Sequence, residues 1–383
     1  MRVAAHGMAA RAVSGREWAI REALPLWSGA GFDPADSLFR ERLDFAGAPI
    51  AAPRRLTTQA RQIYVLAHAA LLGWHPQGRT QALAAAHAMT GAYLSPDGRP
   101  GWAFSIGQDG RPADARRELY AHAFALFGLA WAWRLDPDPR FAVARDATLA
   151  LLDGPFAGAG GGYLSYLGDD GAERLQNPHM HLLEAMLAWY DATGDAAYLE
   201  RARAIGALFM TTFFQPDTSA LPEYFGAGWT RLGGERGTLV EPGHHFEWAW
   251  LLHRLQVTAG LVTEAVARPL YDHACRFGHD AAGLIVDCLR EDGTLVTASR
   301  RTWPHTEAIK AHAAAFEQGD EQAEDRAARV WDLMFAQFLS GAAAGGWRDH
   351  LDASGAPLHG YMPATTLYHV FCAIAEANRV WPS

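Results

Sequence analysis

Apolar positions along this chain recur with the period of an α-helix in a series of segments, and the segments come in pairs. Several joints within pairs are short and polar, such as "RLDPDPR" and "DATGDAA", which is typical of tight hairpins between antiparallel helices. The pattern predicts twelve helices, over residues 15–28, 57–74, 80–95, 116–134, 139–153, 178–193, 196–213, 243–260, 262–279, 304–316, 319–340 and 362–378.

A second pattern fills the stretches between the helix pairs. Each stretch holds a short apolar or aromatic run, a turn rich in Gly and Asp, and another short run, which predicts a β-hairpin. The repeating unit is therefore a hairpin, a helix, a short turn and a helix, about 60 residues long and present six times. The clearest hairpins are expected at 101–112, 162–173, 283–296 and 346–358, and weaker ones at 37–49 and 224–237.

Six helix pairs can bury their apolar faces by stacking side by side. An open solenoid and a closed ring both satisfy this requirement. The inner helices are polar at one end only, which favours a closed all-α ring, an (α/α)6 barrel with short β-hairpins in the loops over one face. We expect one such domain to span residues 1–383.

Composition restricts the partners. The net charge of −9 argues against nucleic-acid binding, which usually needs a basic patch. The chain has no apolar run long enough for a membrane span and no apolar segment near its N-terminus typical of a signal peptide. Its three cysteines show no CxxC spacing and are expected to be reduced thiols. We therefore expect a cytoplasmic protein, a monomer or homodimer, with a small-molecule substrate.

The polar residues that stand out follow the repeat. They lie near the starts of alternate predicted helices and are 59 to 63 residues apart. In a closed ring these side chains would converge on one cavity, roofed by the hairpin loops. The residues are Arg61, His122, His181, His244, Glu307 and His369.

The stretch "VEPGHHFEWAWLL" contains the strongest candidate. His244 and Glu247 are one turn apart and share a helix face, so the carboxylate can orient the imidazole or bind a ligand hydroxyl. A zinc site is the main alternative, but "HHFE" is not HExxH and no cysteines cluster nearby, so we expect neither a metal nor a cofactor. His245 points to another face and is expected to be structural.

Two other helix starts carry candidates. Asn177, His181 and Glu184 lie on one face, although Asn177 before Pro178 would also suit a helix N-cap. His122 lies in the apolar "LYAHAFAL", where a buried structural role is equally plausible.

Arg61 lies on an apolar helix and needs an acceptor, either a carboxylate or a ligand. Trp303 and Glu307 are four residues apart near a helix start, and the Trp could be a packing residue or a platform for a sugar ring. The set offers no serine nucleophile elbow, phosphate loop or dinucleotide fingerprint. Paired imidazoles instead suit proton abstraction next to a carbonyl, because their pKa lies near neutral pH.

These stretches resemble the N-acylglucosamine 2-epimerase superfamily, which includes sugar isomerases and 2-epimerases. The resemblance rests on "TTQARQIYVLAHA", "QNPHMHLLEAMLAWYDATGD", "PGHHFEWAWLL", "RTWPHTEAIKAH" and "YHVFCAIAEA", which together run from residue 57 to residue 376. The wording "GHxFEW" and "WPxTE" is more similar to the mannose and sulfoquinovose isomerase branch than to the N-acylglucosamine branch. The family's fold is also an (α/α)6 barrel.

The resemblance implies that His244 and His369 are an acid/base pair acting without a metal through a cis-enediol. It implies that Arg61, Asn177, His181 and Glu247 bind the opened sugar, with Tyr120 and Trp303 lining the pocket. The expected activity is interconversion of an aldose and a ketose of the mannose/fructose type. Open alternatives are a sugar 2-epimerase of the mannose/glucose or N-acylglucosamine type and a mannose-6-phosphate isomerase-like enzyme.

Two further questions stay open at this stage. A sugar-phosphate site would require several basic groups near the loops, and we expect a neutral monosaccharide instead. The candidate basic groups are Arg111, Arg116, Arg117, Arg300 and Arg301. A glycoside-binding or glycoside-cleaving barrel is the non-isomerase alternative, with Asp349 and Asp352 as conceivable carboxylates.

Overall fold

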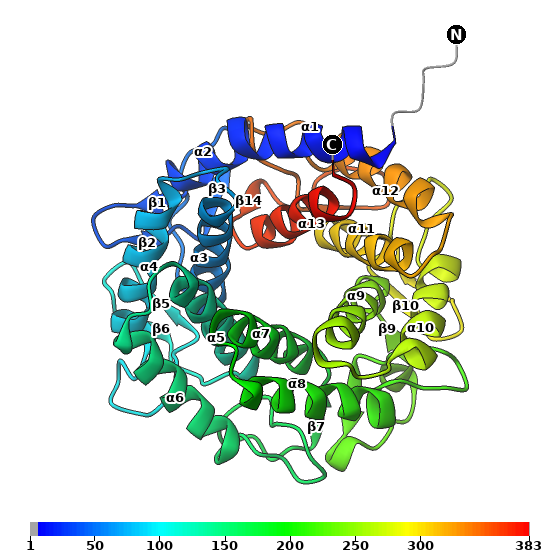
Figure 1. The fold of residues 1–383 in the computed structure, drawn as a ribbon, viewed down its shortest axis with the longest axis horizontal. Helices are drawn as coiled ribbons and strands as arrows, with labels where there is room; N and C mark the ends of the chain where they lie inside the picture. Colours follow the sequence, from blue (N-terminus) through cyan, green and yellow to red (C-terminus); the bar gives the residue numbers. More distant parts are fainter. Residues whose placement is uncertain (1–6, 383) are drawn as a thin grey trace.

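The computed structural model of the chain describes residues 7–382, and two concentric rings of helices dominate it (Figure 1). The inner ring consists of α3 (Leu56–Leu71), α5 (Leu119–Leu135), α7 (Asn177–Thr193), α9 (Pro242–Ala259), α11 (Thr302–Glu317) and α13 (Thr366–Val380). The outer ring begins with α1 (Met8–Trp18), which continues through a π-helical turn (Ala19–Ala23) into α2 (Leu24–Ser28). Its other helices are α4 (Gly78–Tyr93), α6 (Pro139–Asp153), α8 (Ala196–Leu208), α10 (Glu264–Phe277) and α12 (Ala323–Gln337). A second π-helical turn (Phe209–Phe213) follows α8.

The inner ring is closed. Each inner helix contacts the next, and the last, α13, contacts the first, α3, which confirms the predicted (α/α)6 barrel. The six units are not identical, however. Five inner helices are followed by their outer partner, whereas α13 packs against α1 from the other end of the chain. The first helix also begins at Met8 and not at residue 15, because its N-terminal part lacks the apolar periodicity on which the prediction relied.

The burial pattern explains why the two rings differ in sequence. An inner helix has neighbours on both sides and an outer helix behind it, so it is apolar nearly all round. In α5 almost every residue is buried, including Phe124, Phe127 and Leu129. The outer helix α12 buries only one face, with Val330 and Trp331 among its buried residues. Charged residues on the inner ring therefore have few places to lie except the ring's two ends and its centre.

Local signals set many of the helix ends. Asp138 and Asp195 cap α6 and α8 by accepting the backbone N–H groups of Arg140 and Ala197. Pro242 occupies the first turn of α9, where its missing N–H leaves no hydrogen bond unmade. Gly194 ends α7 in the left-handed conformation that glycine adopts most easily.

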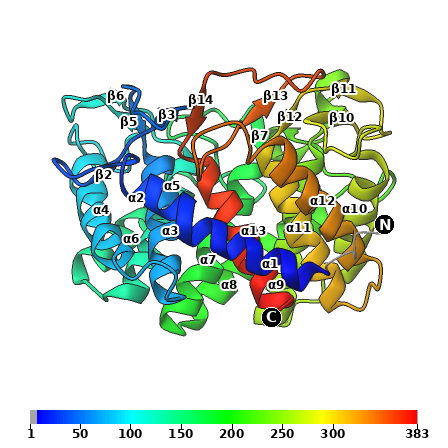
Figure 2. The ribbon, with the colours of Figure 1, turned by 90° about the horizontal axis from the view of Figure 1, so that it is seen from above.

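Short strands gather mostly at one end of the barrel (Figure 2). Nine of the fourteen strands in residues 7–382 overlap the predicted hairpin stretches, and β5 with β6 and β10 with β11 pair locally as expected, whereas β1, β4, β9, β12 and β14 lie outside those stretches. The strands are β1 (Phe32–Asp33), β2 (Leu38–Phe39), β3 (Arg42–Asp44), β4 (Arg54–Arg55), β5 (Ser105–Ile106), β6 (Pro112–Asp114), β7 (Glu173–Leu175), β8 (Tyr224–Gly226), β9 (Leu239–Val240), β10 (Cys288–Arg290), β11 (Leu295–Thr297), β12 (Arg300–Arg301), β13 (His350–Leu351) and β14 (Tyr361–Pro363).

The strands also join neighbouring repeats, which the hairpin pattern did not predict. The strand that precedes an inner helix pairs antiparallel with the loop strand of the next repeat: β4 with β5, β7 with β8, β9 with β10, β12 with β13, and β14 with β3. A single bridge between Glu118 and Tyr166 occupies the corresponding place before α5. The loops over the inner-helix N-termini are therefore connected around the whole ring.

None of the helices within residues 7–382 combines the length and the apolar character that crossing a membrane would require.

Candidate active site

A cavity opens where the inner helices begin. Its inner part has a volume of about 180 Å³ and its adjoining outer part about 270 Å³, and both are lined by Tyr120, Asn177, Glu241 and His244. Apart from Glu241 and His244, which lie close together in the chain, these side chains come from distant segments, so only the closed ring brings them together. The inner part is completed by Arg61, His181, Glu247, Arg301, Trp303 and His369. Of the residues expected at the site, His122, Glu184 and Glu307 do not line the cavity.

His244 is held by a carboxylate that sequence reasoning missed. Its Nδ1 lies 2.9 Å from both oxygens of Glu223, which also accepts a hydrogen bond of 2.9 Å from Gln176 Nε2. Gln176 in turn accepts the indole N–H of Trp248 at 2.7 Å. Because Nδ1–H donates to Glu223, Nε2 is the nitrogen of His244 that remains to exchange a proton with a ligand in the cavity.

The surroundings of His244 favour its charged form. Burial by itself would favour the neutral imidazole and lower the pKa of His244. The charge and hydrogen bond of Glu223 outweigh this effect of burial, and Glu241 and Glu247 add to them, so the pKa of His244 rises to about 9. At neutral pH His244 is therefore an imidazolium, a proton donor.

His369 has the opposite character. Its Nδ1 lies 2.8 Å from Glu307 Oε1, and the other oxygen of Glu307 lies 2.5 Å from the ammonium of Lys310, which is fully buried. Burial and the positive charges of Arg61 and Lys310 lower the pKa of His369 well below its usual range. His369 is therefore neutral, and with Nδ1–H donated to Glu307 its Nε2 is a free base.

Trp303 lies between the two histidines. Its ring centroid is 5.0 Å from that of His244 and 5.8 Å from that of His369. Gly243 makes this packing possible, since a Cβ at that position would lie 2.5 Å from the Trp303 ring. The glycine in "PGHHFEW" thus allows an indole to pack against the first turn of α9.

Arg61 projects into the cavity without a carboxylate partner among residues 7–382. Its guanidinium donates to the hydroxyls of Thr365 at 2.5 Å and Tyr120 at 2.7 Å, and it lies over the ring of Phe124 at 4.2 Å. A buried guanidinium held only by hydroxyls and rings keeps its charge available for an electron-rich ligand group.

Asn177 and His181 line the cavity from α7. Asn177 is the first residue of the helix and makes no capping hydrogen bond, so the N-cap alternative is wrong. Its buried Oδ1 has no partner. Glu184 lies behind His181 and not at the cavity: it accepts Tyr368 O–H at 2.5 and 2.6 Å and lies 3.3 Å from His181 Nδ1. Glu184 is thus a support for His181.

Glu247 is buried, and its Oε1 has no hydrogen-bond partner. Burial and the nearby Glu307 and Glu184 raise the pKa of Glu247 well above its usual range, although Lys310 and His244 oppose the shift. Glu247 therefore holds a proton more readily than an ordinary carboxyl group, and in its protonated form it can donate a hydrogen bond to a ligand oxygen.

One group of residues near the site has the composition of a metal centre. Donor atoms of Glu247, Glu307 and His369 lie within 4.8 Å of one another. The ammonium of Lys310, 2.5 Å from Glu307, already supplies positive charge beside these carboxylates. A divalent ion here would face that cation, so the donor set fits a metal poorly and metal independence stays a prediction.

His122 has a structural role, contrary to the sequence expectation. It is fully buried, its Nδ1–H donates to the carbonyl of Glu118 at 2.7 Å, and its Nε2 accepts the backbone N–H of Trp102 at 3.1 Å. Three other histidines in first turns of inner helices accept a loop backbone N–H in the same way: His179, His245 and His305. The repeat register that placed His122 beside His244 is therefore wrong, because His122 corresponds to His245.

The correct register explains the cavity. Residues two positions before and two positions after these structural histidines are four apart, so they share one helix face. Before them are Tyr120, Asn177 and Trp303, and after them are His181 and Glu247, all of which line the cavity. Phe124 and Glu307 hold the same position on their helices but do not line it.

The charges around the cavity disfavour a phosphate. Its outer part is lined by Glu118, Glu223 and Glu241, and burial raises the pKa of Glu118 to about 7. Of the five candidate arginines only Arg301 lines the cavity, and it is paired with Glu241 at 2.8 Å and Asp287 at 2.9 Å. A phosphate dianion would meet carboxylates at the mouth and no unpaired basic group from these loops.

The carboxylates conceivable for glycoside cleavage are also placed elsewhere. Asp349 accepts the hydroxyl of Thr366 at 2.5 Å, and Asp352 caps an exposed turn through Ser354. Neither lines the cavity.

Sequence reasoning missed Glu223, Glu241, Gln176, Tyr368 and the role of Lys310. Glu223 lies in a loop outside the helical repeat, so no periodicity marks it. Lys310 did carry a signal, since it is the only lysine in the chain and lies in the middle of a predicted inner helix.

A closed helical ring whose inner-helix N-termini surround a cavity with one charged and one neutral imidazole, an arginine and an amide is the architecture of sugar isomerases and epimerases. The comparisons agree with that class. A family model described as N-acylglucosamine 2-epimerase matches residues 38–373. The chain belongs to the N-acylglucosamine 2-epimerase family.

Individual relatives carry more specific names. The mannose-6-phosphate isomerase of Rhizobium meliloti (strain 1021) is 34% identical, over 94% of each chain, and the D-mannose isomerase of Thermobifida fusca is 30% identical, over 86% of each. A crystal structure of D-mannose isomerase matches with a TM-score of 0.84 at 21% identity, covering 96% of this chain and 97% of that one. A cellobiose 2-epimerase from Bacillus thermoamylovorans B4167 matches with a TM-score of 0.86 at 19% identity, covering 96% and 99%.

Proposed function

We propose that this protein interconverts a neutral aldose and its ketose, of the mannose/fructose type, through a cis-enediol. The observation that carries the proposal is the opposite tuning of two imidazoles on one cavity, with a neutral His369 and a charged His244 on either side of Trp303. The names of the relatives at 34% and 30% identity support the isomerase assignment.

The tuning gives each histidine a role in a balanced reaction. In the opened aldose, Nε2 of His369 takes the proton from C2, the C–H electron pair forms the C1=C2 bond, and O1 takes a proton from the His244 imidazolium. The enediol then takes a proton at C1 from His369, while the O2 proton returns to His244 and the carbonyl forms at C2. Both histidines end in the state in which they began.

The remaining polar groups orient the open chain. Arg61 is a donor for the sugar oxygens, and so is Glu247 when it is protonated, whereas Oδ1 of Asn177 is an acceptor without a partner of its own. Donors that meet the developing enediolate oxygens lower the barrier most, because charge on those oxygens increases in the transition state. The indole of Trp303 can pack against C–H groups of the sugar.

A 2-epimerase is the second candidate, because two imidazoles on one cavity can also serve opposite faces of C2. In epimerisation His369 would keep the proton taken from C2, and the His244 imidazolium would give its proton to the opposite face of C2. The pair would then end in the reverse of the resting state that the two pKa shifts favour. The unequal tuning of the pair therefore favours isomerisation.

The acidic outer cavity supports a neutral sugar, even though one relative bears the name mannose-6-phosphate isomerase. We propose a cytoplasmic setting for the reaction, and the three cysteines, none of them in a disulfide, are compatible with a reducing compartment. A monomeric or homodimeric state is part of the same proposal.

Proton NMR in heavy water tests the proposal directly. Mannose, glucose, fructose, N-acetylglucosamine and mannose 6-phosphate are each incubated with the protein, so that product and exchanged carbon are read together. We expect mannose to yield fructose, with deuterium at C1 to the extent that the proton on His369 exchanges with solvent before it returns to the sugar. Glucose as the first product from mannose would favour the epimerase, and a kcat/KM for mannose 6-phosphate a hundredfold above that for mannose would contradict the neutral substrate.

Matched histidine variants test the assignment of the pair. His244→Ala and His369→Ala should each lower kcat by at least about 10³-fold, since positioned acid/base groups contribute about 10²–10⁴-fold. His87→Ala, on the outer helix α4, is the control and should retain kcat. Circular dichroism melts of all three variants establish that any loss is not one of folding.

A further inference from the structure

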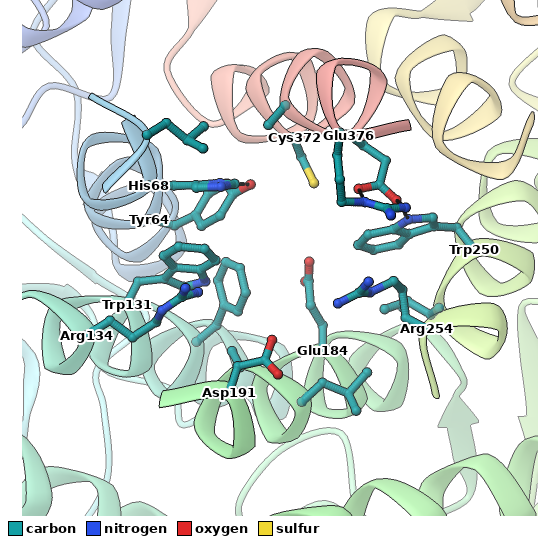
Figure 3. Close-up of a pocket in the computed structure, with 17 residues that line it drawn as sticks. Tyr64, His68, Trp131, Arg134, Glu184, Asp191, Trp250, Arg254, Cys372 and Glu376 are labelled. Carbon is teal, nitrogen blue, oxygen red and sulfur yellow. Dashed lines mark hydrogen bonds and ion pairs between the residues drawn. The ribbon is translucent and has the colours of Figure 1, made fainter. Parts of the chain in front are cut away.

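A second cavity lies at the other end of the barrel, toward the C-terminal ends of the inner helices (Figure 3). Its volume is about 350 Å³, within the range of small-molecule sites. We call it the rear chamber and define it by Tyr64, Phe127, Trp131, Arg134, Asp191, Trp250 and Arg254, with Glu184, Glu376, His68 and Cys372 completing its walls.

The rear chamber contains two arginines without ion-pair partners. Figure 3 shows Arg134 and Arg254 reaching toward the chamber from opposite sides. Arg134 lies over the Trp131 ring at 4.3 Å, but within residues 7–382 neither guanidinium has a carboxylate within 4.0 Å or a hydrogen-bond acceptor. Their positive charges are therefore not balanced by any contact within the described chain.

Most of the carboxylates of the chamber are already engaged. Glu184 accepts the hydroxyl of Tyr368, and Glu376 accepts Trp250 Nε1–H at 2.9 Å and Arg379 at 2.8 and 2.9 Å. Only Asp191 has no such partner, and Asp191 and Arg134 are both exposed, whereas Arg254 is half-buried. The charged lining residues are three arginines and three carboxylates, so the formal charge of the chamber is zero and its preference for an anion rests on the placement of the unpaired Arg134 and Arg254.

The chamber also offers a donor and aromatic walls. Trp131 is 9% exposed, and its buried Nε1–H has no acceptor. Tyr64 packs against Trp131 at 4.9 Å, and Phe127 packs against Tyr64 at 5.0 Å. An unsatisfied buried donor costs free energy unless a ligand or water accepts its hydrogen bond.

We propose that the rear chamber binds an organic monoanion, a carboxylate or sulfonate attached to an aromatic ring. The anionic group would lie between Arg134 and Arg254, and the ring would pack against the aromatic walls, with one oxygen in reach of Trp131 Nε1–H. Arginines in the last turn of a helix often just offset the helix dipole. That explanation fits Arg134 at the end of α5, but Arg254 lies more than one turn before the end of α9.

The rear chamber is separate from the sugar cavity. Glu184 lines the rear chamber, whereas His181, to which it is hydrogen-bonded, lines the sugar cavity. The two cavities share no lining residue. A ligand in the rear chamber and a sugar in the other should therefore bind together.

Isothermal titration calorimetry with 1-naphthoate tests the proposal, with the neutral 1-naphthalenemethanol as the matched ligand. We expect 1-naphthoate to bind with a Kd below about 1 mM, and the neutral analogue at least about tenfold more weakly, since charge-assisted bonds to guanidinium are the stronger kind. Arg134→Gln and Arg254→Gln should each weaken naphthoate binding at least about tenfold and leave sugar turnover unchanged. Arg21→Gln on the outer helix is the control and should bind as the unchanged protein does.

Three results would overturn the proposal. The first is the absence of naphthoate binding at about 10 mM. The second is that the neutral analogue binds as tightly as naphthoate, or that the Arg134→Gln/Arg254→Gln double variant binds naphthoate as tightly as the unchanged protein does. The third is displacement of naphthoate by saturating mannose. The binding measurement does not depend on catalysis, so it stands even where the sugar assay shows a different activity.

Discussion

The pair formed by His244 and Glu223 leads to a prediction about pH dependence. Glu223→Gln keeps the size of the side chain but removes the charge that raises the pKa of His244 to about 9. Without that charge the pKa should fall to the ordinary value of about 6.5 or lower, because the site stays buried. A shift of this size corresponds to about 3 kcal/mol between the two protonation states of the imidazole.

The consequence for catalysis depends on pH. If His244 acts as its imidazolium, the fraction in the active form should drop at least about fourfold at pH 7 and about 70-fold at pH 8.5 in Glu223→Gln. The assay is kcat/KM for mannose from pH 5.5 to pH 10. The unchanged protein should lose activity only near pH 9, and the variant should lose it two or more pH units lower.

A stability measurement gives an independent check of the same pair. The folded-state pKa of His244 lies above its unfolded value, so the pair stabilises the fold fully below about pH 6.5 and loses that contribution as pH rises through about 9. The difference in free energy of unfolding between the unchanged protein and Glu223→Gln should therefore shrink from pH 6 to pH 10.

Identical alkaline limbs in the two rate profiles would refute the assignment of His244 as the acid. Glu241→Gln, whose carboxylate is 4.0 Å from His244, should shift the limb less.

Three further predictions concern other parts of the site. Lys310→Met removes the cation beside Glu307, so the pKa of His369 should rise and the acid limb of the kcat/KM profile should move toward neutral pH. An acid limb at the same pH as in the unchanged protein would show that Lys310 does not act on His369. His122→Ala should lower the free energy of unfolding by about 1–3 kcal/mol, since it leaves a buried N–H unpaired, with little change in KM for the sugar; a large rise in KM with unchanged thermal stability would return His122 to the binding site. Dialysis against EDTA should leave turnover unchanged, and activity that is lost and then restored by a divalent ion would make Glu247, Glu307 and His369 ligands of a metal.

The repeat could be predicted from the sequence because it is a local property. Helical periodicity, short polar joints and the Asp-Gly turns each depend on a few neighbouring residues, and they yielded the helices and the closed ring. The same periodicity located Arg61, Asn177, His181, His244, Glu247, Trp303 and His369 near helix starts. The sixth helix pair escaped it, because α13 finds its outer partner α1 at the opposite end of the chain.

Other features depend on contacts between residues far apart in the chain. Glu223 determines the charge of His244 from a loop that has no periodic pattern, and Lys310 acts on His369 through Glu307. Adjacent histidines in "PGHHFEW" differ in role because a rotation of about 100° per residue turns one toward the cavity and the other toward a loop backbone. Periodicity states that both lie at a helix start, but which of them meets a carboxylate and which meets a backbone N–H follows only from the packing of loops around the closed ring. The pKa of each imidazole depends in turn on that packing, because burial and charge act over a few ångströms in space and not along the chain.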